Sequence, residues 1–298
     1  MKISAYAVMA LLLFFPQVQP ARAQEIEEKQ IAAGKFSFDP EGGYLYLDGW
    51  LRQTIMLLKV PDQADIDAYK KDWDEAFAKA KAKYAKRLAS WELEKKAPGG
   101  PAARITEKPI EPVLETFTIG DIETRTIVRI GPAYVFNKDN KNFHYSYLTK
   151  LQPGTYIYYG PVWLDANAGY VGTCYCMGSV KFEVKPGVIT DAGNFLTAAL
   201  YQAPATPPRP NLSFTPEGTF FIFRKIKVEV GKFTWGLPAS LASFPSVRAD
   251  FHAAGKMDNH FGISIARMPA IPGVLGYRRD KVIDLKATAT PVASTAQP

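Results

Sequence analysis

The spacing of apolar residues differs in one stretch of this chain from the spacing on either side of it. Over most of its length, apolar and polar positions alternate with a period of two, as in Val180, Phe182 and Val184, which are separated by charged residues. A period of two is typical of half-buried strands. Turn signals such as Pro153-Gly154 separate the short runs. The pattern predicts strands at 124–130, 133–136, 143–151, 155–159 and 180–184, and an antiparallel β-sandwich as the fold.

An additional hairpin is predicted near the start of the chain. Residues 44–47 alternate, and the following Asp48-Gly49 pair is typical of a two-residue hairpin turn. We therefore expect residues 50–60 to form the return strand.

From Asp62 the apolar period becomes about 3.6, which predicts a long amphipathic helical insertion at 62–97. Asp62 can cap this helix, and Asp65 favours its N-terminal dipole. At 1.5 Å per residue the helix approaches 50 Å. The apolar positions, called the stripe below, are Ile66, Tyr69, Trp73, Phe77, Ala80, Tyr84, Leu88 and Trp91.

The helix is longer than a typical strand of ~20 Å, so part of its stripe can lack cover within its own domain. Three interpretations follow: a helix packed on its own sheet, a projecting arm that contacts a protein partner or a second copy, and a membrane-surface helix. In the second interpretation the contact residues are Tyr69, Trp73, Phe77, Tyr84, Leu88 and Trp91.

The two ends of the chain differ from its middle. Residues 1–23 combine Lys2, an apolar run and the small-residue triplet 21–23, which predicts a signal peptide. The mature chain, with a sandwich at 24–202, is then exported, to the periplasm or beyond it to the outer membrane or the medium. No later run is long enough to span a membrane.

The C-terminal third is organised by a proline-rich segment. Residues 203–210 (APATPPRP) predict a stiff linker. A smaller, irregular β-rich region is expected at 211–286, with strand character at 220–230. The composition of 287–298 predicts a disordered tail.

Charge restricts the class of partner. The net charge of +7 falls to +5 without residues 1–23, and no basic block is interleaved with aromatic residues. Nucleic acid is therefore not an expected partner. Weak association with an anionic envelope surface is compatible with this charge.

Both cysteines of the chain, Cys174 and Cys176, are in the segment 151–195. Residues i and i+2 of a strand share a face, so the two sulfurs lie together. A disulfide requires a local bend, which the flanking glycines permit. The alternatives are two buried thiols, a redox pair, or a soft-metal site with Met177.

Other candidate chemistry is sparse. Two Asp-x-His pairs, Asp250/His252 and Asp258/His260, offer four ligands for a metal, although such short pairs also arise by chance. His144 is expected to be a surface or hydrogen-bonded residue. The sequence contains no G-x-S-x-G elbow, H-E-x-x-H pair or phosphate-binding glycine loop. We therefore expect no catalytic residue and no cofactor.

Aromatic residues are concentrated beside Gly160-Pro161, at Tyr156, Tyr158, Tyr159 and Trp163. Sandwich core is their expected role, with a sugar- or peptide-stacking surface as the alternative.

The motifs LQPGTYIYYGP and CYCMGSVKFEVKPGVITDAGNF resemble small exported bacterial β-sandwich domains of the PEGA-like and transthyretin-like kind, and uncharacterised secreted proteins of Gram-negative bacteria. The resemblance covers about residues 143–196 and consists of turn motifs. It implies a sandwich fold and an envelope setting, and it carries over no catalytic residue.

The sequence thus predicts a non-catalytic exported module that acts in envelope interaction or assembly through the helix. The alternative is a periplasmic protein that handles thiols or a soft metal through Cys174 and Cys176.

Overall fold

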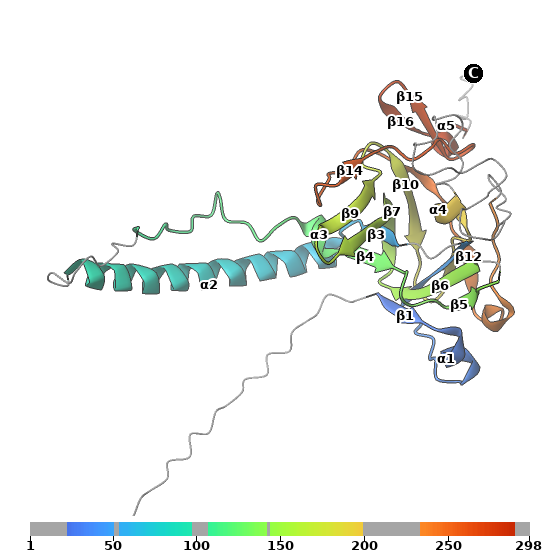
Figure 1. Ribbon diagram of the computed structural model, residues 1–298, viewed down its shortest axis with the longest axis horizontal. Helices are drawn as coiled ribbons and strands as arrows, with labels where there is room; N and C mark the ends of the chain where they lie inside the picture. The colour runs from blue at the N-terminus through green and yellow to red at the C-terminus, as the bar shows by residue number, and fades with distance from the viewer. Residues whose placement is uncertain (1–22, 51–53, 97–106, 142–143, 199–232, 290–298) are drawn as a thin grey trace, which may run out of the picture.

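The computed structural model describes residues 23–50, 54–96, 107–141, 144–198 and 233–289 (Figure 1). The signal peptide predicted at 1–23, except its last residue, lies outside this part of the chain. So do the linker predicted at 203–210 and the strand predicted at 220–230.

The fold is mainly β, with two principal sheets. The first has the order β1-β6-β2-β11-β12, with β5 paired to β6. Its strands are β1 (Gln24–Ile26), β2 (Gly43–Trp50), β5 (Asn137–Asp139), β6 (His144–Leu151), β11 (Ile189–Asp191) and β12 (Ser246–Arg248). The second has the order β13-β10-β7-β3-β4. Its strands are β3 (Ile55–Lys59), β4 (Ile127–Ile130), β7 (Gly154–Gly160), β10 (Ser179–Val184) and β13 (His252–Ala254).

Smaller elements surround these sheets. Two further sheets consist of β8 (Val162–Asp165), β9 (Gly169–Cys174) and β14 (Ser264–Ile265), and of β15 (Leu275–Arg278) and β16 (Lys281–Asp284). The helices are α1 (Glu28–Ala32), α2 (Gln63–Lys96), α3 (Ile122–Arg125), α4 (Phe195–Ala198), the 3₁₀ turn η2 (Ala239–Leu241) and α5 (Leu285–Ala289). No helix in the described part of the chain is long and apolar enough to cross a bilayer.

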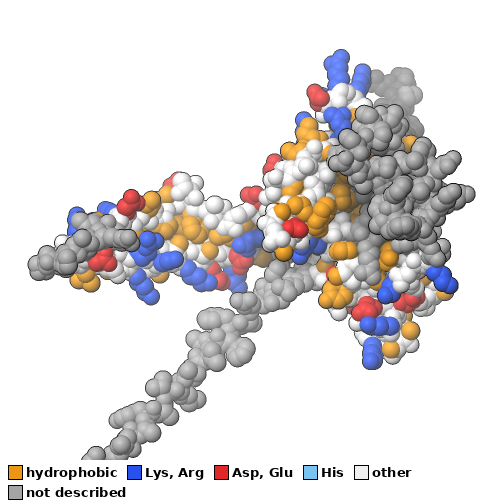
Figure 2. Space-filling model, in the orientation of Figure 1, with side chains coloured by type: hydrophobic (Ala, Val, Ile, Leu, Met, Phe, Trp, Pro, Cys, Tyr) orange, Lys and Arg blue, Asp and Glu red, His pale blue; other side chains and the backbone are white. Residues whose placement is uncertain are grey.

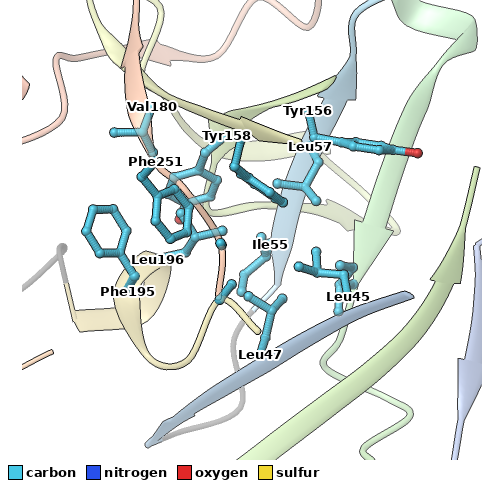
Figure 3. Packing of buried hydrophobic residues seen from close by; sticks show 14 of the residues in the cluster. Leu45, Leu47, Ile55, Leu57, Tyr156, Tyr158, Val180, Phe195, Leu196 and Phe251 are labelled. Carbon is cyan, nitrogen blue, oxygen red and sulfur yellow. The ribbon is translucent and has the colours of Figure 1, made fainter. Parts of the chain in front are cut away.

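The main core lies between the two principal sheets (Figure 3). Leu45 and Leu47 of β2 lie opposite Ile55 and Leu57 of β3, and Tyr158 of β7 completes the layer. All five side chains are fully buried. Burial of each such side chain contributes about 1.5–3 kcal/mol, so this layer is what holds the sheets together.

Both principal sheets are also covered on their outer faces. The evidence is that alternate residues of the central strands belong to different hydrophobic clusters. Tyr44 and Tyr46 of β2 belong to a cluster outside the first sheet, which Leu241 of η2 joins. Met56 and Leu58 of β3 belong to a cluster outside the second sheet. The buried runs in β2 and β3 therefore reflect cover on two sides.

Tyr156, Tyr158 and Tyr159 are buried, as their predicted core role requires. Trp163 of β8 is instead 49% exposed. His144 is an exposed residue at the start of β6, and its Nε2 lies 2.8 Å from Asp48 Oδ1. This agrees with the expectation of a hydrogen-bonded surface residue.

The hairpin predicted at Asp48-Gly49 is wrong. Strand β2 continues through both residues to Trp50, and it belongs to a different sheet from β3. Gly49 has another role: a Cβ at this position would lie 2.8–3.0 Å from side-chain atoms of Thr197 in α4. The glycine thus permits close packing of α4 on β2, and the chain crosses between sheets after it.

Most strand pairs are antiparallel, but β11 pairs in parallel with both β2 and β12, and β14 pairs in parallel with β9. The C-terminal β-rich region supplies edge strands to both principal sheets, β12 to the first and β13 to the second. Of the tail predicted as disordered, residues 287–289 form the end of α5, and 290–298 lie outside the described residues.

Candidate functional site

Helix α2 begins at an anchored N-terminus. The Asp62 carboxylate accepts a 3.0 Å hydrogen bond from the Asp65 backbone N–H, and the Asp65 carboxylate accepts one of 3.1 Å from the Asp62 N–H. This is a reciprocal capping box. Buried Lys59 at the end of β3 donates to both carboxylates at 2.6 Å, and this hydrogen bond lowers the pKa of Asp62. The predicted cap is confirmed, and it joins the helix to the second sheet.

From this anchor the 34-residue helix projects away from the sandwich (Figure 1). The stripe repeats every 11 residues: Ile66, Phe77 and Leu88 share one row, and Tyr69, Ala80 and Trp91 share another. Eleven residues in three turns give 3.67 residues per turn, so the stripe stays on one side of a nearly straight helix. Every stripe residue is half-buried and no residue of α2 is buried. Figure 2 shows hydrophobic side chains along the projecting helix, between basic and acidic ones.

Part of the stripe is covered by the chain itself, which the sequence did not predict. Residues 107–121, called the return segment below, run back beside α2 (Figure 1). Phe117 packs edge-on against Trp73 and Phe77, with ring centroids 5.5 and 5.2 Å away. The Trp73 indole N–H donates to the Phe117 carbonyl at 3.2 Å, and the Tyr69 hydroxyl donates to the Gly120 carbonyl at 2.7 Å.

Charged contacts extend this cover in both directions. Arg125 of α3 pairs with Asp72 at 2.6 Å and lies over the Tyr69 ring, close to the sandwich. Further out, Lys81 pairs with Glu111 of the return segment at 2.7 Å. These contacts therefore hold the half of the helix nearest the sandwich, and we call the helix and return segment together the arm.

The predicted contact residues thus divide into two groups. Tyr69, Trp73 and Phe77 contact the return segment or α3. Tyr84, Leu88 and Trp91 lie beyond Lys81, towards the tip, where the Lys95 ammonium is 4.7 Å from the Trp91 ring centroid. We call these three residues the distal stripe.

Exposed apolar side chains gather on the arm. Leu93 of α2 is 70% exposed, and Ile110 and Leu114 of the return segment are 92% and 61% exposed. Sequence periodicity could not identify the last two, because the return segment is neither helix nor strand.

The charges on α2 are unevenly distributed. Residues 63–78 carry five acids and two lysines, a net charge of −3. Residues 79–96 carry seven Lys or Arg and two Glu, a net charge of +5. The distal stripe is therefore surrounded by basic side chains, which favour a partner of opposite charge.

Cys174 and Cys176 form a disulfide, with Cα atoms 5.1 Å apart. Strand β9 ends at Cys174, and a turn follows in which the Gly178 N–H donates to the Tyr175 carbonyl. The bend that the bridge needs thus comes from the end of the strand. Both cysteines are buried in the cluster outside the second sheet, whereas Tyr175 enters the main core. The bridge fixes a corner of the fold, and its burial limits attack by other thiols.

The two Asp-x-His pairs are not brought together. His252 contacts Asp284 at 2.9 Å and Asp250 at 3.1 Å, and Lys286 donates to Asp250, which lowers the pKa of that carboxyl. His260 instead lies 3.3 Å from Asp121. The Cys176 sulfur lies 3.5 Å from the Asp258 carbonyl oxygen.

Within the described ranges, no group of three or more His, Cys, Asp or Glu residues is arranged to hold a metal ion. The ring nitrogens of His252 are already hydrogen-bonded to carboxylates, which ties β13 to β16.

Comparisons with protein-family models, curated protein sequences and solved structures gave no significant match. The function must therefore be argued from the arm and the other local geometry.

Proposed function

We propose that this chain is a non-catalytic, exported module that acts in envelope interaction or assembly through its arm. The observation that supports the proposal best is that a helix of 34 residues, rich in aromatic side chains, has none of them buried. A folded chain gains stability by covering such residues, so leaving them half-exposed favours a role in contact with another molecule.

The distal stripe is the proposed contact surface, and a protein with an acidic, partly apolar surface is the proposed partner. The net charge of +5 over residues 79–96 attracts such a surface. Two copies joined at their tips would place like charges together, which disfavours self-association. The half nearest the sandwich is already engaged by Phe117 and Arg125.

The predicted export and the resemblance to PEGA-like and transthyretin-like domains support an envelope setting for this partner. The alternative role in thiol or metal handling remains a prediction, and the buried, bonded state of Cys174 and Cys176 does not favour it.

The test is a pull-down from envelope extract with two matched variants. Leu88→Glu places a carboxylate in the distal stripe, whereas Ala89→Glu makes the same charge change at the neighbouring exposed position outside the stripe. We expect the parent and Ala89→Glu proteins to retain the same acidic protein, and Leu88→Glu to lose it. Added salt should weaken this retention, because screening acts on the basic surface.

Identical retention by both variants would refute the proposed surface. If the only protein retained were a second copy of the chain, the acidic partner would be wrong, and sedimentation would show a dimer.

A further inference from the structure

A cavity of about 410 Å³ is lined in part by residues of α4 and β12. These two elements lie at the end of the sandwich remote from the arm (Figure 1). Its volume is within the usual range for small-molecule sites. The lining comes from α4, β12, the segments beside them and the C-terminal region: Phe195, Phe233, Trp235, Arg248, Ala249, Asp250, Phe251, Ile271, Pro272, Val274 and Lys286.

The apolar wall of this cavity is aromatic and flat. The Phe195 ring stacks on Phe251 with centroids 3.9 Å apart and on Phe233 with centroids 4.5 Å apart. Phe195 and Phe251 also belong to the main core. Because the core holds these two rings in place, the wall is largely pre-formed for the apolar part of a ligand.

The polar side of the cavity carries one cation, Arg248, that forms no ion pair among the described residues. Lys286 is paired with Asp250, so these two lining charges neutralise each other. The Arg248 guanidinium lies over the Trp235 ring, 3.3 Å from its centroid, and has no ion pair or hydrogen bond among the residues that the structure describes. Asp191 interacts electrostatically with Arg248 without forming an ion pair. The Asp191 oxygens instead accept hydrogen bonds of 2.8 and 2.7 Å from the backbone N–H groups of Gly193 and Gly236.

An unsatisfied donor lies beside this cation. The Trp235 Nε1 atom is buried and, within the described part of the chain, has no hydrogen-bond acceptor. A buried indole N–H usually finds a partner, and leaving it unpaired costs free energy. The Arg248 guanidinium and the Trp235 ring are stacked and line the same cavity, whereas the indole N–H itself is buried.

We propose that this cavity binds an organic carboxylate with an apolar body. The carboxylate would accept hydrogen bonds from Arg248, and the apolar part of the ligand would lie against Phe195, Phe233 and Phe251. A charge-assisted bond from arginine is stronger than a neutral one, so the anion fixes the orientation of the ligand. This site is separate from the arm and does not depend on the proposed partner.

The test is calorimetric titration of the full-length mature chain with 2-naphthoate and with its uncharged analogue 2-naphthamide. We expect naphthoate to bind at one site and naphthamide to bind at least tenfold more weakly. Arg248→Gln should weaken naphthoate binding at least tenfold.

Arg129→Gln provides the matched control, because Arg129 is an exposed residue on β4, at the edge of the second sheet opposite β13. This variant should bind as the parent does, and circular dichroism should show all variants folded. Tighter binding of decanoate than of naphthoate would support the anion site and identify an acyl chain as the body. Absence of binding at 5 mM, equal binding of naphthoate and naphthamide, or parent-like binding by Arg248→Gln would overturn the proposal.

Discussion

The cover on the half of α2 nearest the sandwich depends on one aromatic side chain, Phe117. It is half-buried and meets two rings, those of Trp73 and Phe77. Half of the burial free energy of a phenylalanine is about 1 kcal/mol, and each aromatic pair adds about 0.5–1.5 kcal/mol. Phe117→Ala should therefore cost about 2–4 kcal/mol of local stability.

The loss should stay local, because Phe117 contacts α2 and not the sheets. Its own backbone N–H donates to the Val113 carbonyl at 3.0 Å, which gives hydrogen exchange a direct reporter. We expect amide exchange over residues 113–121 to accelerate at least tenfold in Phe117→Ala, while the thermal midpoint of the sandwich changes little.

Glu115→Ala is the control, since Glu115 is an exposed neighbour in the same segment. Unchanged exchange in Phe117→Ala would show that the return segment is held by other contacts. A large fall in the thermal midpoint would show that the arm is part of the cooperative core, contrary to our description.

Two other perturbations have defined outcomes. The double variant Cys174→Ala/Cys176→Ala should lower the unfolding free energy by about 1.6 kcal/mol, the loop-closure value for a three-residue ring. It should leave partner capture intact in the pull-down. Loss of capture at unchanged stability would favour the thiol function. The hydrogen bond that His144 donates to the Asp48 carboxylate raises the pKa of His144 above its ordinary 6.5. This interaction therefore stabilises the fold fully below pH 6.5 and is lost as the pH rises through the raised pKa. Asp48→Asn should lower the His144 pKa measured by NMR, and a parent value at or below 6.5 would contradict this assignment.

Local sequence signals predicted part of the secondary structure. The strands predicted at 143–151, 155–159 and 180–184 are observed as β6, β7 and β10. The strand predicted at 133–136 is wrong, because these residues are irregular and β5 begins only at Asn137. The helix was predicted from its period and from Asp62, and its observed bounds differ from the prediction by one residue at each end. The core role of Tyr156, Tyr158 and Tyr159 was also predicted. Alternation alone would have placed only one of the neighbours Tyr158 and Tyr159 inside, and both are buried because β7 is covered on two faces. The Asp48-Gly49 turn failed because local preference for a turn was overridden by packing of Thr197 against Gly49.

Contacts between distant segments could not be predicted from local pattern. Tyr69 and Gly120 are 51 residues apart, and the return segment has no regular period that would place it on the helix. The cavity likewise joins Trp235 and Arg248 from an irregular segment and an edge strand. Only the path of the chain in three dimensions brings such residues together.

Site-specific photocrosslinking in intact cells tests the central claim about the arm most directly. A benzophenone amino acid would replace Leu88 in one strain and Ala89 in another, so that the two probes differ only in the side of the helix they occupy. The account predicts that position 88 crosslinks to one acidic protein and that position 89 gives little of this product. Equal crosslinking from both positions, or crosslinks from position 88 only to lipid or to a second copy of the chain, would contradict it.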